Sequence, residues 1–231
     1  RGPVVIGAPY GGPPPFEMPY VFKWRTQQSD HPDIDFQIKP YSREEAAAMM
    51  GIQHCAALPT IETCLADPAR AKALNSEVPK KLAQLCFHLG AKLVHLSTDT
   101  VFDGVAGNYQ PTDQPSPLNL YGETKAAAEI EVLRFGREHA AVLRTSPIIG
   151  NSAGGDRGLH ERLFASWKEG KPTVLFTDEI RQPVEVSNLA DVTIELCERS
   201  NLSGLFHWAG TEAMSRHEIG VRIARHFGLT P

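Results

Sequence analysis

The sequence lacks long apolar runs, and none of its stretches approaches the ~18 residues that a membrane-spanning helix needs. It also lacks any block of lysine and arginine, and its formal net charge is −4. We therefore do not expect nucleic acid or an anionic membrane as its main partner. The first residues, RGPVVIGAPYGG, show no signal-peptide pattern, which predicts a cytoplasmic protein.

Patterns typical of metal sites and disulfide frameworks are missing too. The four cysteines form no CxxC pair, and the nine histidines show no HExxH or similar ligand spacing. The sequence therefore predicts buried thiols, no disulfide staple and no structural metal.

What the chain does have is a length of 231 residues and 42% hydrophobic content, which is enough for a sizeable core. Short apolar runs alternate with helical patterns, and several runs are apolar on nearly every residue, as strands covered on both faces require. The predicted strands cover residues 3–8, 19–24, 52–57, 91–97, 141–146, 173–176 and 204–210. This alternation predicts an α/β fold with a doubly wound parallel sheet.

The helices between these strands have recognisable ends. Asp67 followed by Pro68 predicts the start of a helix that runs toward residue 90 and bends at Pro79. The other predicted helices cover 123–138, 158–169 and the segments that follow the capping-box patterns Ser42–Glu45 and Ser215–Glu218.

A glycine-rich turn follows the first predicted strand, beginning at Gly7 and running into three prolines at 13–15. Glycines at this place would let the backbone approach a pyrophosphate at a helix N-terminus, but three prolines cannot continue into an ordinary helix. Gly7 is a candidate dinucleotide-binding residue, and an ordinary glycine- and proline-rich turn is the alternative.

The pair Tyr121 and Lys125 stands four residues apart in 118-LNLYGETKAAAE-129, a run of good helix formers. Residues with this spacing share one helix face, and a nearby ammonium favours the phenolate form of tyrosine. The pair is therefore a candidate general acid or base, and an ordinary exposed Tyr/Lys pair is the alternative.

Hydroxyl side chains follow the fourth predicted strand in 97-STDTVFDG-104. In doubly wound sheets, ligands bind outside the carboxyl ends of the strands. Ser97 and Thr98 are candidates to polarise a ketone beside Tyr121, and turn-capping hydroxyls with an Asx-turn at Asp99 are the alternative.

Four motifs together resemble the extended short-chain dehydrogenase/reductases. Within that family they are similar to the dTDP-4-dehydrorhamnose reductase branch, which also contains the regulatory β subunit of methionine adenosyltransferase. The motifs are 93-LVHLSTDTVFDG-104, 117-PLNLYGETKAAAE-129, 142-VLRTSPIIG-150 and 204-GLFHWAGTEAMSRHEI-219, and the resemblance covers residues 52–229.

The resemblance implies a Rossmann domain that binds NAD(P)H over residues 1–150. It also implies a smaller, mainly substrate-binding region over 151–231, from which some elements return to the Rossmann sheet. It further implies that Tyr121 donates a proton to a sugar C4 oxygen as hydride arrives at C4, that Lys125 holds the ribose, and that Thr98 orients the carbonyl.

The resemblance assigns further residues to two sets. The implied cofactor-binding residues are Ala56, Ala57, Asn75, Tyr121 and Lys125, and the implied substrate-binding residues are Thr98, Asp99, Arg181 and Gln182. Gly7, Arg25 and Ser97, which stand at the ends of predicted strands, are further candidates for cofactor binding. Lys23 and Arg25 would neutralise a 2′-phosphate, and no acidic residue stands there to bind a ribose 2′-hydroxyl. NADP(H) is therefore expected to be preferred, with NAD(H) as the alternative.

Two departures from the family pattern keep two functions open. HCAA begins at residue 54, so less chain precedes it than two βα units usually occupy, and the glycine motif is not GxxGxxG; this half is either incomplete here or degraded. Pro147 stands where the rhamnose reductases commonly carry a tryptophan. The first function is an NAD(P)H-dependent reductase of a nucleotide-linked 4-keto-6-deoxysugar, compatible with a homodimer. The alternative is a non-catalytic, NADP-binding regulatory subunit.

Overall fold

The computed structural model describes residues 4–6, 52–54, 57–152, 155 and 157–229. Several sequence predictions concern residues that lie outside these ranges. They are the glycine-rich turn with Gly7, the strand predicted at 19–24 with Arg25 after it, the helix predicted after Ser42, and Ala56.

The chain divides into two compact units. Unit 1 consists of the residues up to Leu143 together with Thr193–Phe206, and unit 2 consists of Arg144–Val192 together with His207–Pro231. The chain therefore passes from one unit to the other three times, within two strands and one helix that are named below.

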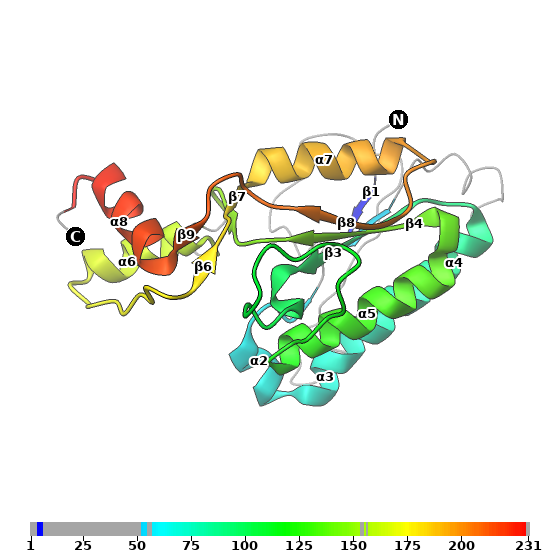
Figure 1. Ribbon diagram of the computed structural model, residues 1–231, viewed down its shortest axis with the longest axis horizontal. Coiled ribbons are helices and arrows are strands. Elements are labelled where there is room, and N and C mark those ends of the chain that lie inside the picture. The colour runs from blue at the N-terminus through cyan, green and yellow to red at the C-terminus, as the bar shows by residue number, and fades with distance from the viewer. Residues whose placement is uncertain (1–3, 7–51, 55–56, 153–154, 156, 230–231) are drawn as a thin grey trace. The chain divides into compact units, whose positions relative to one another are not determined.

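A five-stranded sheet forms the centre of unit 1 (Figure 1). Its strands are, in spatial order, β1 (Val4–Ile6), β2 (Ile52–His54), β3 (Leu93–Thr98), β4 (Ala140–Thr145) and β8 (Gly204–Trp208). β1 is parallel to β2 and β2 to β3, with Ile52 opposite both Val4 and Leu93. The last residues of β4 and β8 belong to unit 2.

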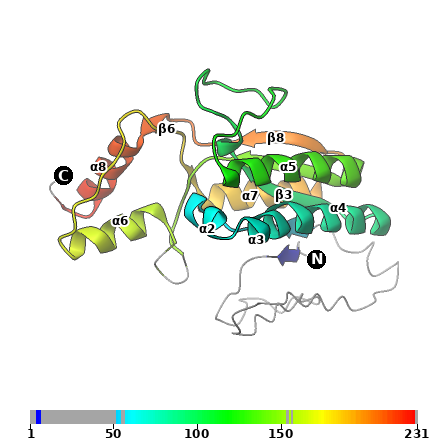
Figure 2. The same cartoon turned by 90° about the horizontal axis from the view of Figure 1, so that it is seen from below.

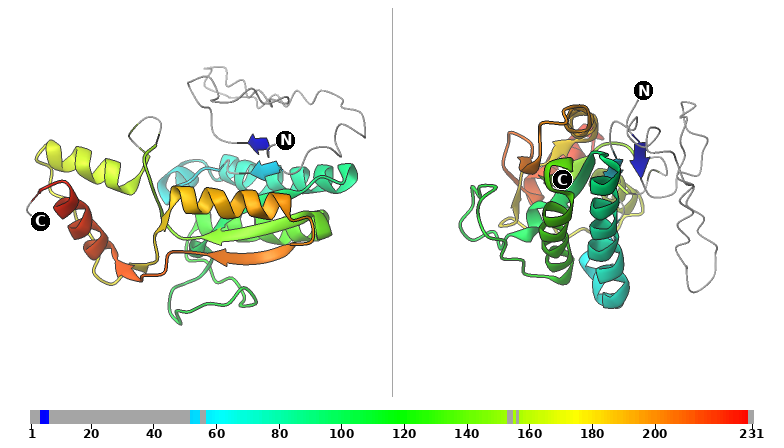
Figure 3. Two further views of the ribbon diagram at one scale, coloured as in Figure 1. Left: turned by 90° about the horizontal axis from the view of Figure 1, so that it is seen from above. Right: turned by 90° about the vertical axis from the view of Figure 1, so that its right-hand side faces the viewer.

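Helices cover the sheet of unit 1 on both faces. Helices α4 (Val78–Leu89) and α5 (Leu120–Gly136) lie side by side on one face (Figure 2, Figure 3). The part of α7 (Val186–Glu198) that belongs to unit 1 lies on the other face (Figure 1). Within the described part of the chain, no helix combines the length and the apolar character needed to cross a membrane.

The core of unit 1 lies between the sheet and the helix pair. β3 begins with Leu93 and Val94 and β4 with Ala140–Leu143, apolar residues that suit a sheet covered on both faces, whereas His95, Ser97 and Thr98 depart from this pattern in β3. The fully buried cluster consists of Ala83, Cys86, Ala91, Leu93, Val132, Ala140 and Val142. Burial raises the pKa of the Cys86 thiol to about 12, so this cysteine stays protonated and acts as an apolar core residue.

The helix predicted from Asp67 to residue 90 is interrupted rather than bent. Asp67 caps α3 (Pro68–Lys72) by accepting a 2.9 Å hydrogen bond from Arg70 N, as the Asp-Pro pair predicted. A π-helical segment, η1 (Ala73–Glu77), then precedes α4. The interruption lies one turn before Pro79 because proline has no N–H to donate to the preceding turn.

The described part of unit 2 contains two small sheets, two complete helices and the first residues of α7. Strands β5 (Ile148–Ile149) and β7 (Val184–Glu185) pair in parallel, and β6 (Ile180–Arg181) pairs antiparallel with β9 (Met214–Ser215). Helices α6 (Leu159–Lys168) and α8 (Arg216–His226) contact each other, and the rings of Phe164 and Phe227 pack with centroids 4.3 Å apart. The capping box predicted at Ser215 and Glu218 begins α8.

The strand predicted at 173–176 is wrong. These residues form no strand in the described part of unit 2, and Val174 and Phe176 are 85% and 60% exposed. His217 N donates to Phe176 O, and Leu175 packs against Gly220. A short apolar run becomes a strand only where a neighbouring strand can accept its backbone hydrogen bonds.

Candidate functional site

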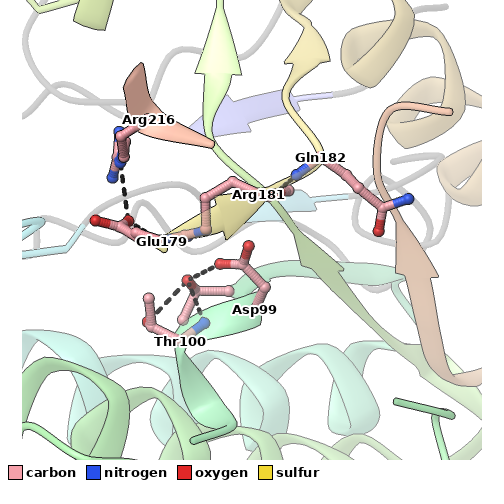
Figure 4. A network of polar contacts seen from close by, with 8 residues as sticks. Asp99, Thr100, Glu179, Arg181, Gln182 and Arg216 are labelled. Carbon is pink, nitrogen blue, oxygen red and sulfur yellow. Dashed lines mark hydrogen bonds and ion pairs between the residues drawn. The ribbon is translucent and has the colours of Figure 1, made fainter. Parts of the chain in front are cut away.

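The carboxyl end of β3 places Thr98 at the entrance to a short helical turn, η2 (Asp99–Val101). Its side chain accepts a 3.2 Å hydrogen bond from Thr100 N and lies 2.9 Å from Thr100 Oγ1. The Thr98 hydroxyl also donates to Asp99 Oδ1 over 3.3 Å (Figure 4). The turn therefore fixes the rotamer of a buried hydroxyl at the edge of the sheet where ligands bind in this fold class.

Helix α5 begins against η2. Asn119 caps it by accepting a 2.9 Å hydrogen bond from Gly122 N. A Cβ added to Gly122 would stand 2.4 Å from Thr100 O and 3.0 Å from Pro117 Cβ. Only glycine allows the first turn of α5 to approach η2 this closely, so Gly122 fixes where the neighbouring Tyr121 lies.

The structure places Tyr121 and Lys125 one turn apart on α5, as the spacing predicted. Tyr121 is half-buried, whereas Lys125 is only 3% exposed. The Lys125 ammonium donates to Leu96 O over 2.6 Å and lies 3.1 Å from His95 Nε2. The lysine is therefore held by groups of β3 as well as by its own helix.

Ser97 and Asn75 lie deeper than a direct ligand contact would suggest. The Ser97 hydroxyl donates to Glu129 Oε1 on α5, and both side chains are buried. Asn75 is fully buried; its amide accepts from Leu58 N over 2.8 Å and donates to Leu58 O and to Thr124 Oγ1. Ala57, just before Leu58, is half-buried. Through its hydrogen bonds to Leu58, Asn75 thus fixes the backbone of the segment that follows β2.

In unit 2, Arg181 forms part of an ion-pair cluster (Figure 4). Glu179 Oε1 accepts from Arg181 Nη1 over 3.0 Å and from Arg216 Nε over 2.8 Å. Burial raises the pKa of the Glu179 carboxyl, but the two guanidinium groups, Arg216 first, more than offset this, so the pKa is lowered. The cluster carries a net charge of about +1, since it joins two cations to one anion.

Two hydrogen bonds fix the backbone of Gln182. Gln182 N donates to Ser146 Oγ over 3.2 Å, and Gln182 O accepts from Gly210 N over 3.0 Å. A Cβ on Gly210 would stand 2.0 Å from Pro183 O, so this contact requires glycine.

Sequence reasoning missed three polar residues at these sites: His95, Glu129 and Arg216. All three stand inside motifs that carry the family resemblance, and Glu129 also stands four residues after Lys125. Their place in these motifs was the one signal in the sequence that could have found them. Their contacts join residues 30, 32 and 37 positions apart, which no local pattern encodes. Among the described residues, no group of three or more His, Cys, Asp or Glu side chains could hold a metal ion.

Comparisons with known proteins agree on the fold. The chain is 34% identical over 183 residues to methionine adenosyltransferase 2 subunit beta of Xenopus laevis, covering 77% of this chain and 54% of that protein. It is 29% identical over 233 residues to the probable low-salt glycan biosynthesis reductase Agl14 of Haloferax volcanii, covering 99% of this chain and 73% of that protein. It is 33% identical over 199 residues to dTDP-4-dehydrorhamnose reductase of Mycobacterium tuberculosis, covering 81% and 64%. The chain therefore spans about half the length of the subunit beta and about two thirds of the reductase.

A solved structure extends this likeness to three dimensions. The dTDP-4-dehydrorhamnose reductase of Bacillus anthracis, in complex with NADP, matches with a TM-score of 0.72 at 25% identity, covering 81% of this chain and 66% of that one. The predicted Rossmann-type doubly wound sheet is confirmed. The family resemblance that the sequence motifs predicted is also confirmed. The family model of the RmlD substrate binding domain matches residues 38–231, which is most of the chain, so the chain belongs to this family.

Proposed function

We propose that this chain forms the catalytic part of an NAD(P)H-dependent reductase that acts on a nucleotide-linked 4-keto-6-deoxysugar. The observation that carries the proposal is that β3 and η2, at whose junction Thr98 stands, pack against α5, whose first turns carry Tyr121 and Lys125. The reductases among its relatives and structural neighbours support this proposal.

The proposed reaction reduces a ketone to an alcohol. The bound dinucleotide supplies the hydride that adds to the carbonyl carbon. Tyr121 donates its phenolic proton to the oxygen, so that no free alkoxide accumulates, and the Lys125 ammonium stabilises the phenolate left behind. The Thr98 hydroxyl, with its rotamer fixed by Thr100 N, orients the carbonyl.

The residues at this edge fit the reactive half of a dinucleotide. An acid, a cation and a hydroxyl are the groups that a hydride-transfer site needs, and the segment with Ala57 and Leu58 leaves the sheet at its carboxyl edge with its course fixed by Asn75. Ala56 belongs to the proposal through the family resemblance, and Gly7, Arg25 and Ser97 through their places at the ends of predicted strands. NADP(H) is proposed over NAD(H) because of Lys23 and Arg25.

The substrate side of the proposal consists of residues that the family resemblance implies. Asp99 and Thr98 are proposed to contact the sugar, and Arg181 and Gln182 the nucleotide, within a region 151–231 that mainly binds substrate. The net positive charge around Glu179 supports Arg181 as a partner of a diphosphate. We also propose a homodimer and a cytoplasmic location.

A second function has its own support. The likeness to methionine adenosyltransferase 2 subunit beta and the presence of Pro147 favour a non-catalytic subunit that binds NADP and regulates a partner enzyme. In this case the Thr98–Tyr121–Lys125 set would bind the dinucleotide without turning over a sugar.

The deciding experiment measures NADPH oxidation at 340 nm by the full-length protein with a dTDP-linked 4-keto-6-deoxysugar. The reductase proposal expects turnover that requires Tyr121. Tight NADPH binding by calorimetry without turnover of dTDP-, UDP- or GDP-linked keto-sugars would replace it with the regulatory function. Parallel titrations with NADH test the cofactor preference, and tighter binding of NADH would reverse it.

A further inference from the structure

A buried layer of polar side chains lies between β3 and α5, beneath the candidate catalytic pair. His95 and Ser97 alternate along β3 and so point to one face of the sheet, and Lys125 and Glu129 stand four residues apart on one face of α5. His95 is 0%, Glu129 2% and Lys125 3% exposed. Groups of this kind are seldom buried unless each is paired, so their partners reveal what the layer does.

The hydrogen bonds define the protonation of His95. An ammonium group has three donors and no acceptor, so charged Lys125 can only donate, to Leu96 O and to the Nε2 atom of His95. For a charged Lys125 we assign Nε2 as the unprotonated ring nitrogen and the proton to Nδ1, so that His95 is a neutral acceptor for the buried cation.

The charges of the layer balance. Glu129 supplies a negative charge on the same face of α5 as Lys125, and the Ser97 hydroxyl donates to it. Of the other titratable residues near the layer, Tyr121 lies on α5 and Asp99 on η2, and His54 of β2 is the register partner of His95. η1 contributes the uncharged Asn75 and Ser76, and Lys80 of α4 pairs with Glu131. In unit 1, β4 contributes only apolar residues, Ala140–Leu143.

We propose that His95 is a positioning residue for the Tyr121–Lys125 pair. As a neutral acceptor it keeps Lys125 charged and directed along β3 before any ligand binds, and the charge of Lys125 in turn favours the phenolate of Tyr121. This inference rests on the proposed function for its catalytic meaning, but not for its physical content. A histidine that merely fills the core would leave the titration of Tyr121 unchanged.

Two substitutions distinguish a hydrogen-bond acceptor at position 95 from a side chain that only fills the core. His95→Gln keeps an acceptor, because the Gln Oε1 atom stands as many bonds from Cα as His Nε2 does. His95→Leu keeps apolar volume but removes the acceptor. Without it, charging a buried lysine is less favourable, so Lys125 should lose its proton at lower pH and the pKa of Tyr121 should rise.

The first readout needs no substrate. The phenolate absorbance near 295 nm is titrated with pH in the full chain, and the same titration with Tyr121→Phe in each background isolates Tyr121 from the other tyrosines. We expect the Tyr121 midpoint to move to higher pH in His95→Leu and to stay near the wild-type midpoint in His95→Gln. Equal Tyr121 midpoints in the wild-type protein, His95→Gln and His95→Leu would overturn the proposal.

A second variant serves as a substitute if His95→Leu does not fold. If circular dichroism shows that His95→Leu is unfolded, His95→Asn replaces it, because its amide ends one bond short of the Nε2 position and cannot reach Lys125. The same outcomes then apply to the Asn variant.

The second readout is turnover. We expect His95→Leu to lower kcat at pH 7 by about 10-fold and to shift the limb of the pH–rate profile that reports Tyr121, with His95→Gln within about twofold of wild type. An equal loss in both variants without a shifted limb would contradict the proposal. If the wild-type protein turns over no keto-sugar, the proposed function fails while the absorbance titration still decides the role of His95.

Discussion

Asn75 Nδ2 donates to Thr124 Oγ1 over 3.0 Å, joining the π-helical segment η1 to the residue that precedes Lys125 on α5. The same amide binds both backbone groups of Leu58. Ser76, the next residue in η1, donates to Thr124 O over 2.7 Å. The segment after β2 and the helix that carries Tyr121 are thereby set by one buried side chain and its neighbour.

The first prediction tests this link. Asn75→Ala would leave Leu58 N without its partner and remove a donor from Thr124 Oγ1, which would still donate to Tyr121 O. We therefore expect it to lower the free energy of unfolding by about 1–3 kcal/mol, the cost of one unsatisfied group. Asn201→Ala, at an exposed turn, is the matched control and should change it by less than ~0.5 kcal/mol. Denaturant unfolding measures both, and equal small effects would show that the buried amide adds no stability.

The second prediction concerns the phenol. Tyr121→Phe keeps the ring and its packing but removes the proton donor, so kcat should fall by about 100-fold or more while the Kd for NADPH stays unchanged. Tyr109→Phe removes a hydroxyl that binds Asp103 in the loop after η2, and it serves as the control. Near-wild-type turnover by Tyr121→Phe would make this tyrosine a packing residue.

The third prediction concerns the close approach of α5 to η2. Alanine is a better helix former than glycine, but at Gly122 its Cβ would stand 2.4 Å from Thr100 O, so α5 must shift. We expect Gly122→Ala to destabilise the chain by about 1–3 kcal/mol, the range for overpacking, and to reduce kcat more than it weakens NADPH binding. Unchanged stability and turnover would mean that the first turn of α5 tolerates displacement.

How far the sequence alone reaches depends on whether a contact is local. The cap at Asp67 and the capping box at Ser215 were predicted correctly because their hydrogen bonds join residues three positions apart. The strand at 173–176 was predicted wrongly because strand formation depends on a distant partner. The spacing of Tyr121 and Lys125 predicted their shared helix face. It could not predict that His95, 30 residues earlier, lies against Lys125.

The fourth prediction concerns the cluster around Glu179. Arg181→Ala should raise the Kd for a dTDP-linked sugar by about 10-fold or more, because an ionised donor is lost to a phosphate, and should leave the Kd for NADPH nearly unchanged. Arg199→Ala, which removes an exposed guanidinium paired with Glu195, controls for net charge. Equal weakening for both ligands would indicate general destabilisation, and no weakening would remove Arg181 from the proposed substrate site.

The fifth prediction follows from Glu161 at the start of α6. The Ser152 hydroxyl, Ser152 N and Gly158 N all donate to its carboxylate and lower its pKa from 4.5 to about 2. Because the pKa is lower in the folded chain, the unfolded chain takes up the proton first. The stabilisation by this carboxylate is therefore complete above about pH 4.5 and is lost as the pH falls to about 2.

Glu161→Gln removes this titration while it keeps the size of the side chain. The thermal midpoint of the wild-type chain should exceed that of Glu161→Gln at pH 6, and the gap should narrow steadily between about pH 4.5 and 2, the interval between the two pKa values. Glu198→Gln, at an exposed position at the end of α7, is the control for the loss of one carboxylate. A gap between wild type and Glu161→Gln that stayed constant across this interval would mean that the hydrogen bonds to Glu161 do not depend on its charge.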